Sequence, residues 1–211
     1  MFFIDEKTVE KYLRMDICID LMRDALASYS RGEAVQVLRI AMQFEDRKIL
    51  GVMPAALPSR NIAGAKLLTV YLDNSARHLP SHQGVVVLFE TDTGALRAVL
   101  DAEGITGIRT AAASAAATDA LAGKDAHVLA ILGTGLQARR HLEAMRCVRD
   151  IREVRVWGRP ESAARFAAEM RTVHGLPVLD CSKDVREAVY GADIICTVTA
   201  SKTPVLPGAA A

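Results

Sequence analysis

Residues 131–138 read Ile131-Leu132-Gly133-Thr134-Gly135-Leu136-Gln137-Ala138. An apolar run precedes the two glycines and a helical pattern follows them, so the segment has the G-x-G-x-x-A form of a dinucleotide-binding turn. Gly133 permits the tight turn, Gly135 lets the backbone approach a pyrophosphate, and Ala138 keeps the helix close to the strand. The alternative is an ordinary glycine turn, but the strand–turn–helix context favours binding of a nicotinamide dinucleotide.

Strand and helix patterns alternate on both sides of this turn from Ala126 onward. We expect strands at 127–132, 153–157, 177–179 and 194–199, and helices at 136–148, 161–174 and 183–190. This alternation predicts a parallel, doubly wound sheet of the Rossmann type, and hence an α/β fold. Four short strands fall below the roughly six of a complete dinucleotide domain, so we expect the sheet to be incomplete.

The residues before Gly123 show a different pattern of predicted elements. We expect a helix at 8–30, strands at 36–44, 49–53, 63–72, 84–90 and 95–101, a hairpin turn at 91–94, and an alanine-rich helix at 106–122. Consecutive strands with hairpin turns predict an antiparallel sheet. The chain thus divides into an α+β domain at 1–122 and a dinucleotide-binding domain at 123–211.

Composition excludes several classes of protein. The chain has 211 residues, is 51% hydrophobic and 24% charged, and carries a formal net charge of +1. It is too apolar to be disordered, too neutral for a nucleic-acid partner, and lacks the apolar run of roughly 20 residues that a membrane span needs. Acidic residues near the start argue against a signal peptide, so we expect a cytoplasmic protein. The cysteines (Cys18, Cys147, Cys181 and Cys196) lack C-x-x-C spacing, which predicts reduced thiols and no metal.

The end of the second predicted strand bears on the choice of cofactor. NAD sites usually place an acidic residue there, about 20 residues after the glycines, to hold the ribose hydroxyls. This chain instead reads Val156-Trp157-Gly158-Arg159-Pro160. A guanidinium suits a 2′-phosphate, although Arg159 is alternatively a solvated loop arginine. The sequence therefore favours NADP(H) over NAD(H).

Two basic residues lie in predicted strands. Lys66 shares a strand face with Leu68 and Val70, where an ammonium group is costly to bury unless it has a partner. It is a candidate for holding a carboxylate or handling a proton, and the alternative is an edge lysine that reaches water. Arg39 lies in the 36–44 strand, where its fork suits a carboxylate, and the alternative is an exposed strand arginine.

Arg109 lies near the start of the predicted 106–122 helix. A cation is unfavourable at the N-terminus of a helix, so its presence suggests a bound anion. The alternative is a salt bridge to Asp101 or Glu103. The polar loop that contains Ser81, His82 and Gln83 either lines a site or makes a turn.

Taken together, these segments resemble the ornithine cyclodeaminase/mu-crystallin family. The matching segments are Leu50-Gly51-Val52-Met53-Pro54, Gly64-Ala65-Lys66, Leu79-Pro80-Ser81-His82-Gln83-Gly84, Arg109-Thr110-Ala111-Ala112, the glycine turn, and Ala192-Asp193-Ile194-Ile195. The Pro-Ser-His-Gln loop and the Trp157-x-Arg159 strand end are similar to the mu-crystallin and imine-reductase branch, in which they accompany NADPH.

The resemblance implies a two-domain homodimer with a substrate domain and a Rossmann domain. By this resemblance Arg39, Lys66 and Arg109 hold the carboxylate and nitrogen of the substrate, and Lys66 is catalytic. The residues implied to bind the cofactor are Ser81, Arg109, Thr110, Gly133, Thr134, Gly135, Leu136, Gln137, Arg159 and Thr199. The family has further Rossmann strands and an acid/base Asp beyond the equivalent of residue 211, so we expect a fragment or a natural truncation.

The resemblance implies an NAD(P)-dependent oxidoreductase for a small amino or imino acid. Such an enzyme reduces a cyclic imine (a ketimine), or interconverts a 2-amino acid with its imino or oxo acid. One alternative is ornithine cyclodeaminase, a lyase that releases ammonia and recycles its NAD, although Arg159 in place of an acid counts against it. Another is a non-catalytic small-ligand binder that depends on NADPH.

Overall fold

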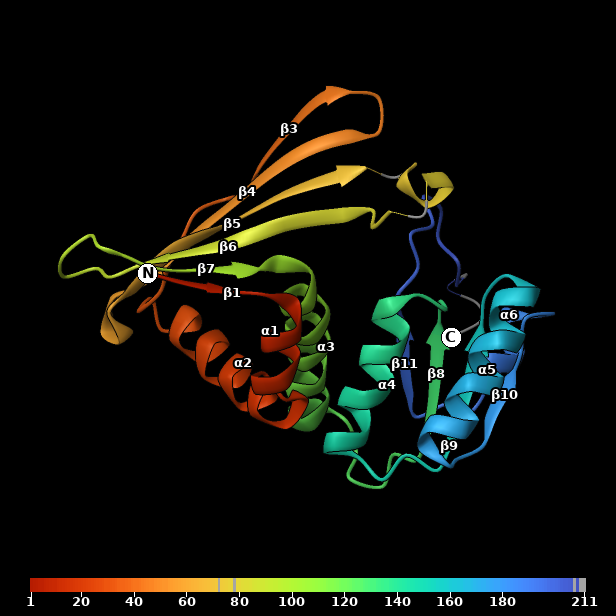
Figure 1. Cartoon of the computed structure of the whole chain (residues 1–211). Coiled ribbons are helices and arrows are strands. Elements are labelled where there is room, and N and C mark those ends of the chain that lie inside the picture. The colour runs from red at the N-terminus through yellow and green to blue at the C-terminus, as the bar shows by residue number, and fades with distance from the viewer. Residues whose placement is uncertain (72, 78, 207, 209–211) are drawn as a thin grey trace. The chain divides into compact units, whose positions relative to one another are not determined.

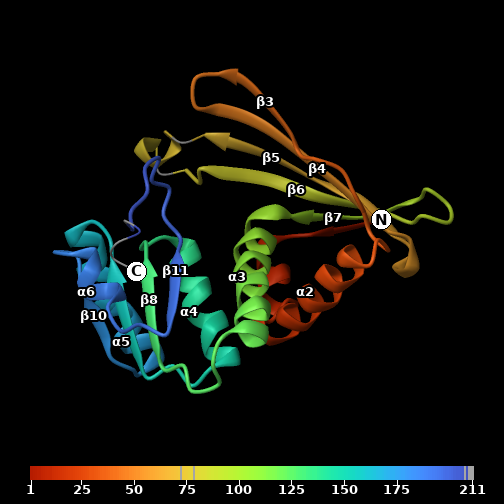
Figure 2. The ribbon, with the colours of Figure 1, turned by 180° about the vertical axis from the view of Figure 1, so that it is seen from behind.

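The computed structural model describes residues 1–71, 73–77, 79–206 and 208. The chain forms two compact units, Met1–Ile108 and Arg109–Ala211. The division falls inside the long helix α3 (Ala102–Leu121). The change in the sequence from successive strands to alternating strands and helices lies just beyond the end of this helix. Figures 1 and 2 show the elements of each unit from two sides. A functional domain boundary near Gly123 stays a prediction.

The first unit is built on a seven-stranded sheet. Its strands are β1 (Phe2–Ile4), β2 (Val35–Gln36), β3 (Ile40–Glu45), β4 (Lys48–Leu57), β5 (Ile62–Tyr71), β6 (His82–Phe89) and β7 (Leu96–Asp101). The order is β1-β7-β6-β5-β4-β2, and β3 also pairs with β4. All pairs are antiparallel except β1 with β7, so the sheet is mixed. The prediction of a purely antiparallel sheet missed β1, because three residues are too few to show an alternating pattern.

The predicted helix at 8–30 is wrong, because two helices occupy this range. Helix α1 (Glu6–Tyr12) begins where the Asp5 carboxylate accepts a hydrogen bond from the backbone N–H of Thr8. It ends at Leu13, and Arg14 is extended before α2 (Met15–Ser30) starts. The hydrophobic spacing continues across the break, which explains why the pattern alone predicted a single helix.

Two strand predictions also need correction. The range 36–44 is not one strand, since residues 37–39 separate β2 from β3. The next strand does not end at Pro54, because β4 continues through it to Leu57. The register explains both: Ala55 pairs with Gln36 and Val52 pairs with Ile40, so Pro54 lies opposite the gap. Proline lacks an N–H, and it is tolerated where no neighbouring strand requires that donor.

Helix α3 starts four residues before the predicted position. The carboxylate of Asp101 accepts hydrogen bonds from the backbone N–H groups of Glu103 at 2.9 Å and Gly104 at 3.0 Å, so Asp101 caps the helix. Ala111, Ala112 and Ala115 in its alanine-rich part are completely buried. Small side chains at these positions allow neighbouring elements to approach the helix closely.

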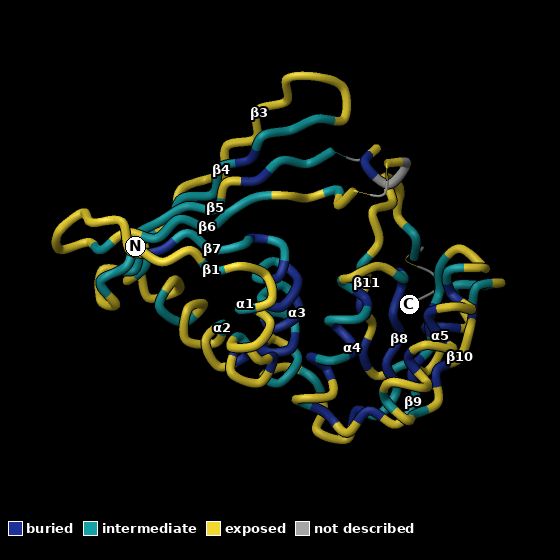
Figure 3. Tube along the Cα trace, viewed as in Figure 1, coloured by how far each residue is buried: buried dark blue, intermediate teal, exposed yellow. Residues whose placement is uncertain are grey.

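The second unit contains the predicted parallel sheet, with strand order β10-β9-β8-β11. Its elements are β8 (Val128–Leu132), α4 (Leu136–Val148), β9 (Glu153–Trp157), α5 (Pro160–His174), β10 (Val178–Asp180), α6 (Val185–Val189) and β11 (Ile194–Thr197). Its core includes Leu129, Ile131, Val154 and Phe166, and Figure 3 shows β8 as a buried strand. The α/β fold class is therefore confirmed.

Two further expectations concern the cysteines and a membrane-spanning helix. Cys18, Cys181 and Cys196 are buried, Cys147 is exposed, and no disulfide joins these four cysteines. Within the described ranges, no helix combines the length and the apolar character that crossing a membrane requires.

Candidate functional site

The glycine turn joins the carboxyl end of β8 to α4. Strand β8 lies between β9 and β11, so the turn sits where the connections leave the sheet in opposite directions, the usual ligand position in such sheets. Gly133 has φ of 137°, and a Cβ at this residue would lie 2.6 Å from the carbonyl oxygen of Val198. Glycine is therefore required by both the backbone conformation and the close approach of the chain after β11.

Gly135, by contrast, is not required by the packing or the backbone conformation of the protein itself. A Cβ at Gly135 would meet no atom within 4 Å, so space is open above the turn. Gly135 is the N-cap of α4, and the first N–H groups of a helix lack partners within that helix. They form a ready anion site together with the helix dipole. These features fit a pyrophosphate.

The neighbouring strand ends carry two more predicted cofactor residues. Arg159 is exposed and follows β9 by two residues, as the N-cap of α5. The preceding Gly158 packs against the glycine turn, because a Cβ there would lie 2.9 Å from Cγ2 of Thr134. Thr199 is exposed and follows the end of β11, rather than lying within a strand as predicted. The glycine turn, Arg159 and Thr199 thus gather at the carboxyl edge of one sheet, whereas Arg109 and Thr110, also predicted for the cofactor, lie on α3.

Lys66 lies in β5 of the first unit, on the sheet face predicted from alternation. It is half-buried, pairs in register with Met53 and Val86, and its Nζ donates a hydrogen bond of 3.2 Å to Oγ1 of Thr106 on α3. A basic side chain is therefore held by a hydroxyl on an otherwise apolar surface, which favours contact with an anionic group.

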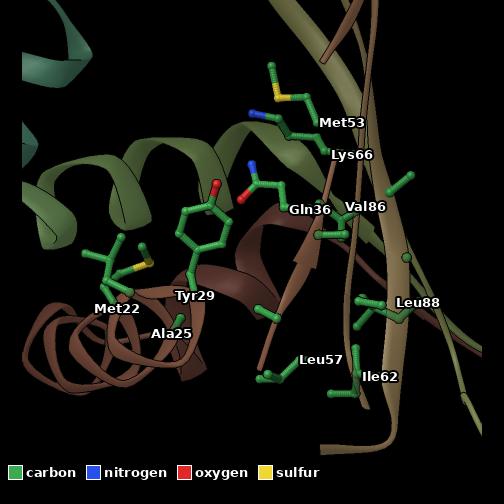
Figure 4. A pocket seen from close by; sticks show the side chains of 16 residues that line it. Met22, Ala25, Tyr29, Gln36, Met53, Leu57, Ile62, Lys66, Val86 and Leu88 are labelled. Carbon is green, nitrogen blue, oxygen red and sulfur yellow. The ribbon is translucent and has the colours of Figure 1, made fainter. Parts of the chain in front are cut away.

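Lys66 also lines a pocket of about 550 Å³ between α2 and the sheet. Figure 4 shows the polar ends of Tyr29, Gln36 and Lys66 toward one side of this pocket, with Leu57 and Ile62 at the other. The size lies in the usual range for small-molecule sites, which are mostly apolar with a few polar groups. The pocket thus suits a small ligand with one polar end.

Ser81 and His82 form a second polar group in this unit. Ser81 Oγ and Nδ1 of His82 are 2.9 Å apart. His82 pairs with Val70 at the start of β6, which places it on the same sheet face as Lys66. Desolvation, followed by the positive charge of Lys66, lowers the pKa of His82 below its ordinary 6.5. The polar loop is therefore coupled electrostatically to Lys66.

The structure corrects the interpretation of Arg39 and Arg109. Arg39 is exposed in the gap between β2 and β3, not in a strand, and Gln36 is the nearby residue that lines the pocket. Arg109 is half-buried and lies two turns inside α3, because the helix begins at Ala102. The helix dipole therefore does not disfavour Arg109, because the dipole acts within the first turn of a helix.

Arg109 nevertheless lies on a chemically relevant face of α3. Residues three and four apart are neighbours on a helix, so Thr106, Arg109 and Thr110 share one face. Thr106 is the residue that accepts the hydrogen bond from Lys66. This face thus carries the two α3 residues, Arg109 and Thr110, that the resemblance assigns to substrate and cofactor.

Sequence reasoning missed two polar residues in the second unit. Oγ of Ser114 on α3 lies 3.0 Å from Nε2 of His141 on α4, and His141 is buried. Their only sequence signal is spacing, because Ser114 follows Thr110 by one helical turn and His141 follows Gln137 by the same interval. Among the described residues no three His, Cys, Asp or Glu side chains cluster as a metal site would require.

Comparison with known proteins identifies the family. The model of the ornithine cyclodeaminase/mu-crystallin family matches residues 2–209. Ketimine reductase mu-crystallin of Mus musculus is 41% identical over 212 residues, which cover 98% of this chain and 66% of the mouse protein. The chain therefore spans just under two thirds of the length of this relative.

Solved structures give the same result. The Δ1-pyrroline-2-carboxylate reductase of Thermococcus litoralis, in complex with NADH and L-proline, superposes with a TM-score of 0.94 at 31% identity, covering 100% of this chain and 65% of that one. An archaeal alanine dehydrogenase dimer with bound NAD gives a TM-score of 0.92 at 30% identity, covering 100% and 64%. The chain belongs to the ornithine cyclodeaminase/mu-crystallin family.

Proposed function

We propose that this chain binds NAD(P)H at the glycine turn and serves the reduction of a small cyclic imine or 2-imino acid that bears a carboxylate. The observation that carries the proposal is the turn itself. The close approach of Val198 requires a glycine at position 133, and the space next to Gly135 is open. The names of the mouse ketimine reductase and the archaeal pyrroline-carboxylate reductase support the class of reaction.

Each basic residue has a role in this proposal. A bound nicotinamide would supply the hydride that reaches the imine carbon. Lys66, held by Thr106, attracts the substrate anion and provides a proton to the nitrogen, so that the C=N bond becomes an amine. Arg109 and Arg39 would fix the carboxylate, which orients the imine. Ser81 and Thr110 would contact the cofactor.

The preference for NADP(H) rests on Arg159. It is exposed beside the glycine turn at the position where NAD-specific proteins usually carry an acid. The two solved relatives were described with NADH and NAD, so their structures support only the nicotinamide class. Direct titration of both reduced cofactors into the chain distinguishes them.

We also propose that the protein is a homodimer that associates through one sheet face. We call this the open face and define it by Ile40, Met42, Phe44 and Leu67, all of which are exposed. In register, Ile40 pairs with Val52 whereas Lys66 pairs with Met53, so the open face points away from the Lys66 side. The archaeal alanine dehydrogenase described as a dimer supports a dimeric assembly.

The test has two stages. Fluorescence titration of NADPH and NADH into the chain measures cofactor binding, and absence of binding to both overturns the proposal. The protein is then assayed for NADPH oxidation with pyrroline-2-carboxylate and piperideine-2-carboxylate. Ammonia release from ornithine without net cofactor oxidation would instead indicate the cyclodeaminase, and binding without any turnover would indicate a small-ligand binder.

A further inference from the structure

Helices α3 and α4 are joined by a short chain of buried polar groups near the glycine turn. Nε2 of His141 lies 3.0 Å from Oγ of Ser114, and Nδ1 of His141 lies 2.7 Å from the carbonyl oxygen of Gln137. Oγ of Ser114 is also 3.4 Å from the carbonyl oxygen of Thr110. The hydrogen bonds thus run from Ser114 on α3, through His141, to the Gln137 carbonyl oxygen in the first turn of α4.

The hydrogen-bond partners define the state of His141. A carbonyl oxygen only accepts hydrogen bonds, so Nδ1 carries the hydrogen and donates it to Gln137. Burial lowers the pKa of the imidazole, which favours the neutral ring. Nε2 of a neutral ring accepts, and the Ser114 hydroxyl is then its donor. The Ser114 hydroxyl has a single hydrogen, so when it donates to Nε2 it does not also donate to the Thr110 carbonyl oxygen. The two hydrogen bonds of the link between the helices are therefore Ser114 to His141 and His141 to Gln137.

We propose that Ser114 and His141 are positioning residues for the cofactor. His141 holds the first turn of α4 through the Gln137 carbonyl oxygen, and Ser114 ties His141 to α3 one helical turn after Thr110. Their effect is to keep the N–H groups after Gly135 aimed at the pyrophosphate before it binds. This inference rests on the proposed function of residues 133–137.

A second link between the same helices provides a matched control. The buried guanidinium of Arg149, just after α4, donates hydrogen bonds of 2.8 Å each to Oδ1 of Asp119 and to the carbonyl oxygens of Ala122 and Gly123. Arg149 is twelve residues from Gln137 in sequence, about 18 Å along the helix axis at 1.5 Å per residue. It joins the helices far from the glycine turn.

The experiment tests both links between α3 and α4 in variants of the protein, with and without cofactor. Ser114→Ala and His141→Leu remove the polar chain, His141→Gln retains an acceptor for Ser114, and Asp119→Asn weakens the distant link. Dissociation constants for NADPH and NADH are measured by fluorescence, thermal stability by circular dichroism, and amide hydrogen exchange at residues 136–139 by mass spectrometry in the absence of cofactor.

We expect Ser114→Ala and His141→Leu to raise the dissociation constant about three- to tenfold, the scale of one buried hydrogen bond, and to speed exchange at 136–139. His141→Gln should lie closer to the wild type. Asp119→Asn should lower the melting temperature and leave the dissociation constant and the exchange at 136–139 unchanged. If both links had only a structural role, the variants of the two links would not differ in this way.

Failure of the positioning role and failure of the proposed function give different results. If the wild-type chain binds a cofactor and Ser114→Ala changes neither affinity nor exchange, the positioning role is wrong. If the wild type binds neither cofactor, the proposed function is wrong, and the exchange rates still decide whether Ser114 and His141 order the turn. Should His141→Leu fail to fold, Ser114→Ala decides alone, because removing a hydroxyl leaves the packing nearly intact.

Discussion

At the scale of single residues, the two glycines of the turn separate a folding requirement from a binding requirement. Gly133→Ala should destabilise the chain by about 1–3 kcal/mol, because φ of 137° disfavours a side chain and the new Cβ would lie 2.6 Å from the Val198 carbonyl oxygen. Urea unfolding measures this loss. Gly135→Ala is the matched control: it should stay within about 0.5 kcal/mol of the wild type and still weaken NADPH binding. Equal stability of both variants would contradict the argument.

Arg159 carries the prediction of cofactor preference. Arg159→Ala should weaken NADPH binding about tenfold and leave NADH binding unchanged, since only the 2′-phosphate offers the guanidinium an extra charged partner. The residue is exposed as the N-cap of α5, and no side-chain hydrogen bond caps that helix, so stability should hardly change. Parallel fluorescence titrations measure both constants. Equal weakening for the two cofactors would show that Arg159 does not read the phosphate.

Lys66 can be tested through its neighbour as well as through turnover. Lys66→Met should raise the pKa of His82 toward its ordinary 6.5, because the positive charge that lowers it is removed while desolvation remains. A proton NMR titration of the imidazole measures the shift. Turnover of the cyclic imine should fall about 10²- to 10⁴-fold, with NADPH affinity retained. An unmoved His82 pKa would show that Lys66 does not face the polar loop.

At the scale of elements, prediction from the sequence was most accurate where a clear hydrophobic periodicity is bounded by turn residues at both ends. Helix α4 and strand β9 have the predicted bounds, because each has a clear period and lies between obvious turns. The break at Leu13 was missed because its cause is local backbone geometry, not a change in hydrophobic spacing. Continuation of β4 through Pro54 depends on which strand lies opposite, and that register is not visible in one segment.

The candidate site was predictable to the extent that it is local. The glycine turn is contiguous in sequence, so its residues were found together, and Lys66 was found by strand alternation. Helix α3 starts where Asp101 caps it. Because the predicted start lay too late in the sequence, Arg109 was wrongly placed in the first turn of the helix, where the dipole acts. Ser114 and His141 meet only through the packing of two helices, which periodicity does not encode.

The junction between the ends of α3 and α4 predicts a pH dependence. Hydrogen bonds from Lys124 and then Arg149 lower the pKa of Asp119 from 3.8 to about 2. A carboxyl group with a lowered pKa stabilises the fold above its unfolded value of 3.8, and this contribution disappears as pH falls toward about 2. Wild type should therefore exceed Asp119→Asn in stability at pH 6, and the difference should narrow between about pH 4 and 2. Urea midpoints across that range test it, and a constant difference would contradict the assignment.

At the scale of the whole molecule, the first unit leaves one side of its sheet uncovered. Helix α2 and Lys66 line the same pocket, and Figure 1 shows α1 and α2 on the same side of this sheet. Ile40, Met42 and Phe44 of the open face are 59%, 52% and 47% exposed, and Figure 3 shows β3 as an exposed strand. Exposed apolar groups gathered on one strand are typical of an interaction surface, and a strand edge adds unpaired backbone groups.

The open face predicts the assembly of the protein. Ile40→Lys should convert a dimer to a monomer, because two copies that meet through this face would each bury a charge without a partner. Light scattering after size-exclusion chromatography measures the mass, and the wild type should elute at twice the chain mass of 22.8 kDa. Asp92→Lys in the β6–β7 hairpin is the control, since it adds a lysine at an exposed position outside the open face and should leave the mass unchanged. NADPH affinity should survive in both variants, as the glycine turn belongs to the second unit. A wild-type chain that stays monomeric at high concentration, or an Ile40→Lys chain that still dimerises, would show that the open face is not where two copies meet.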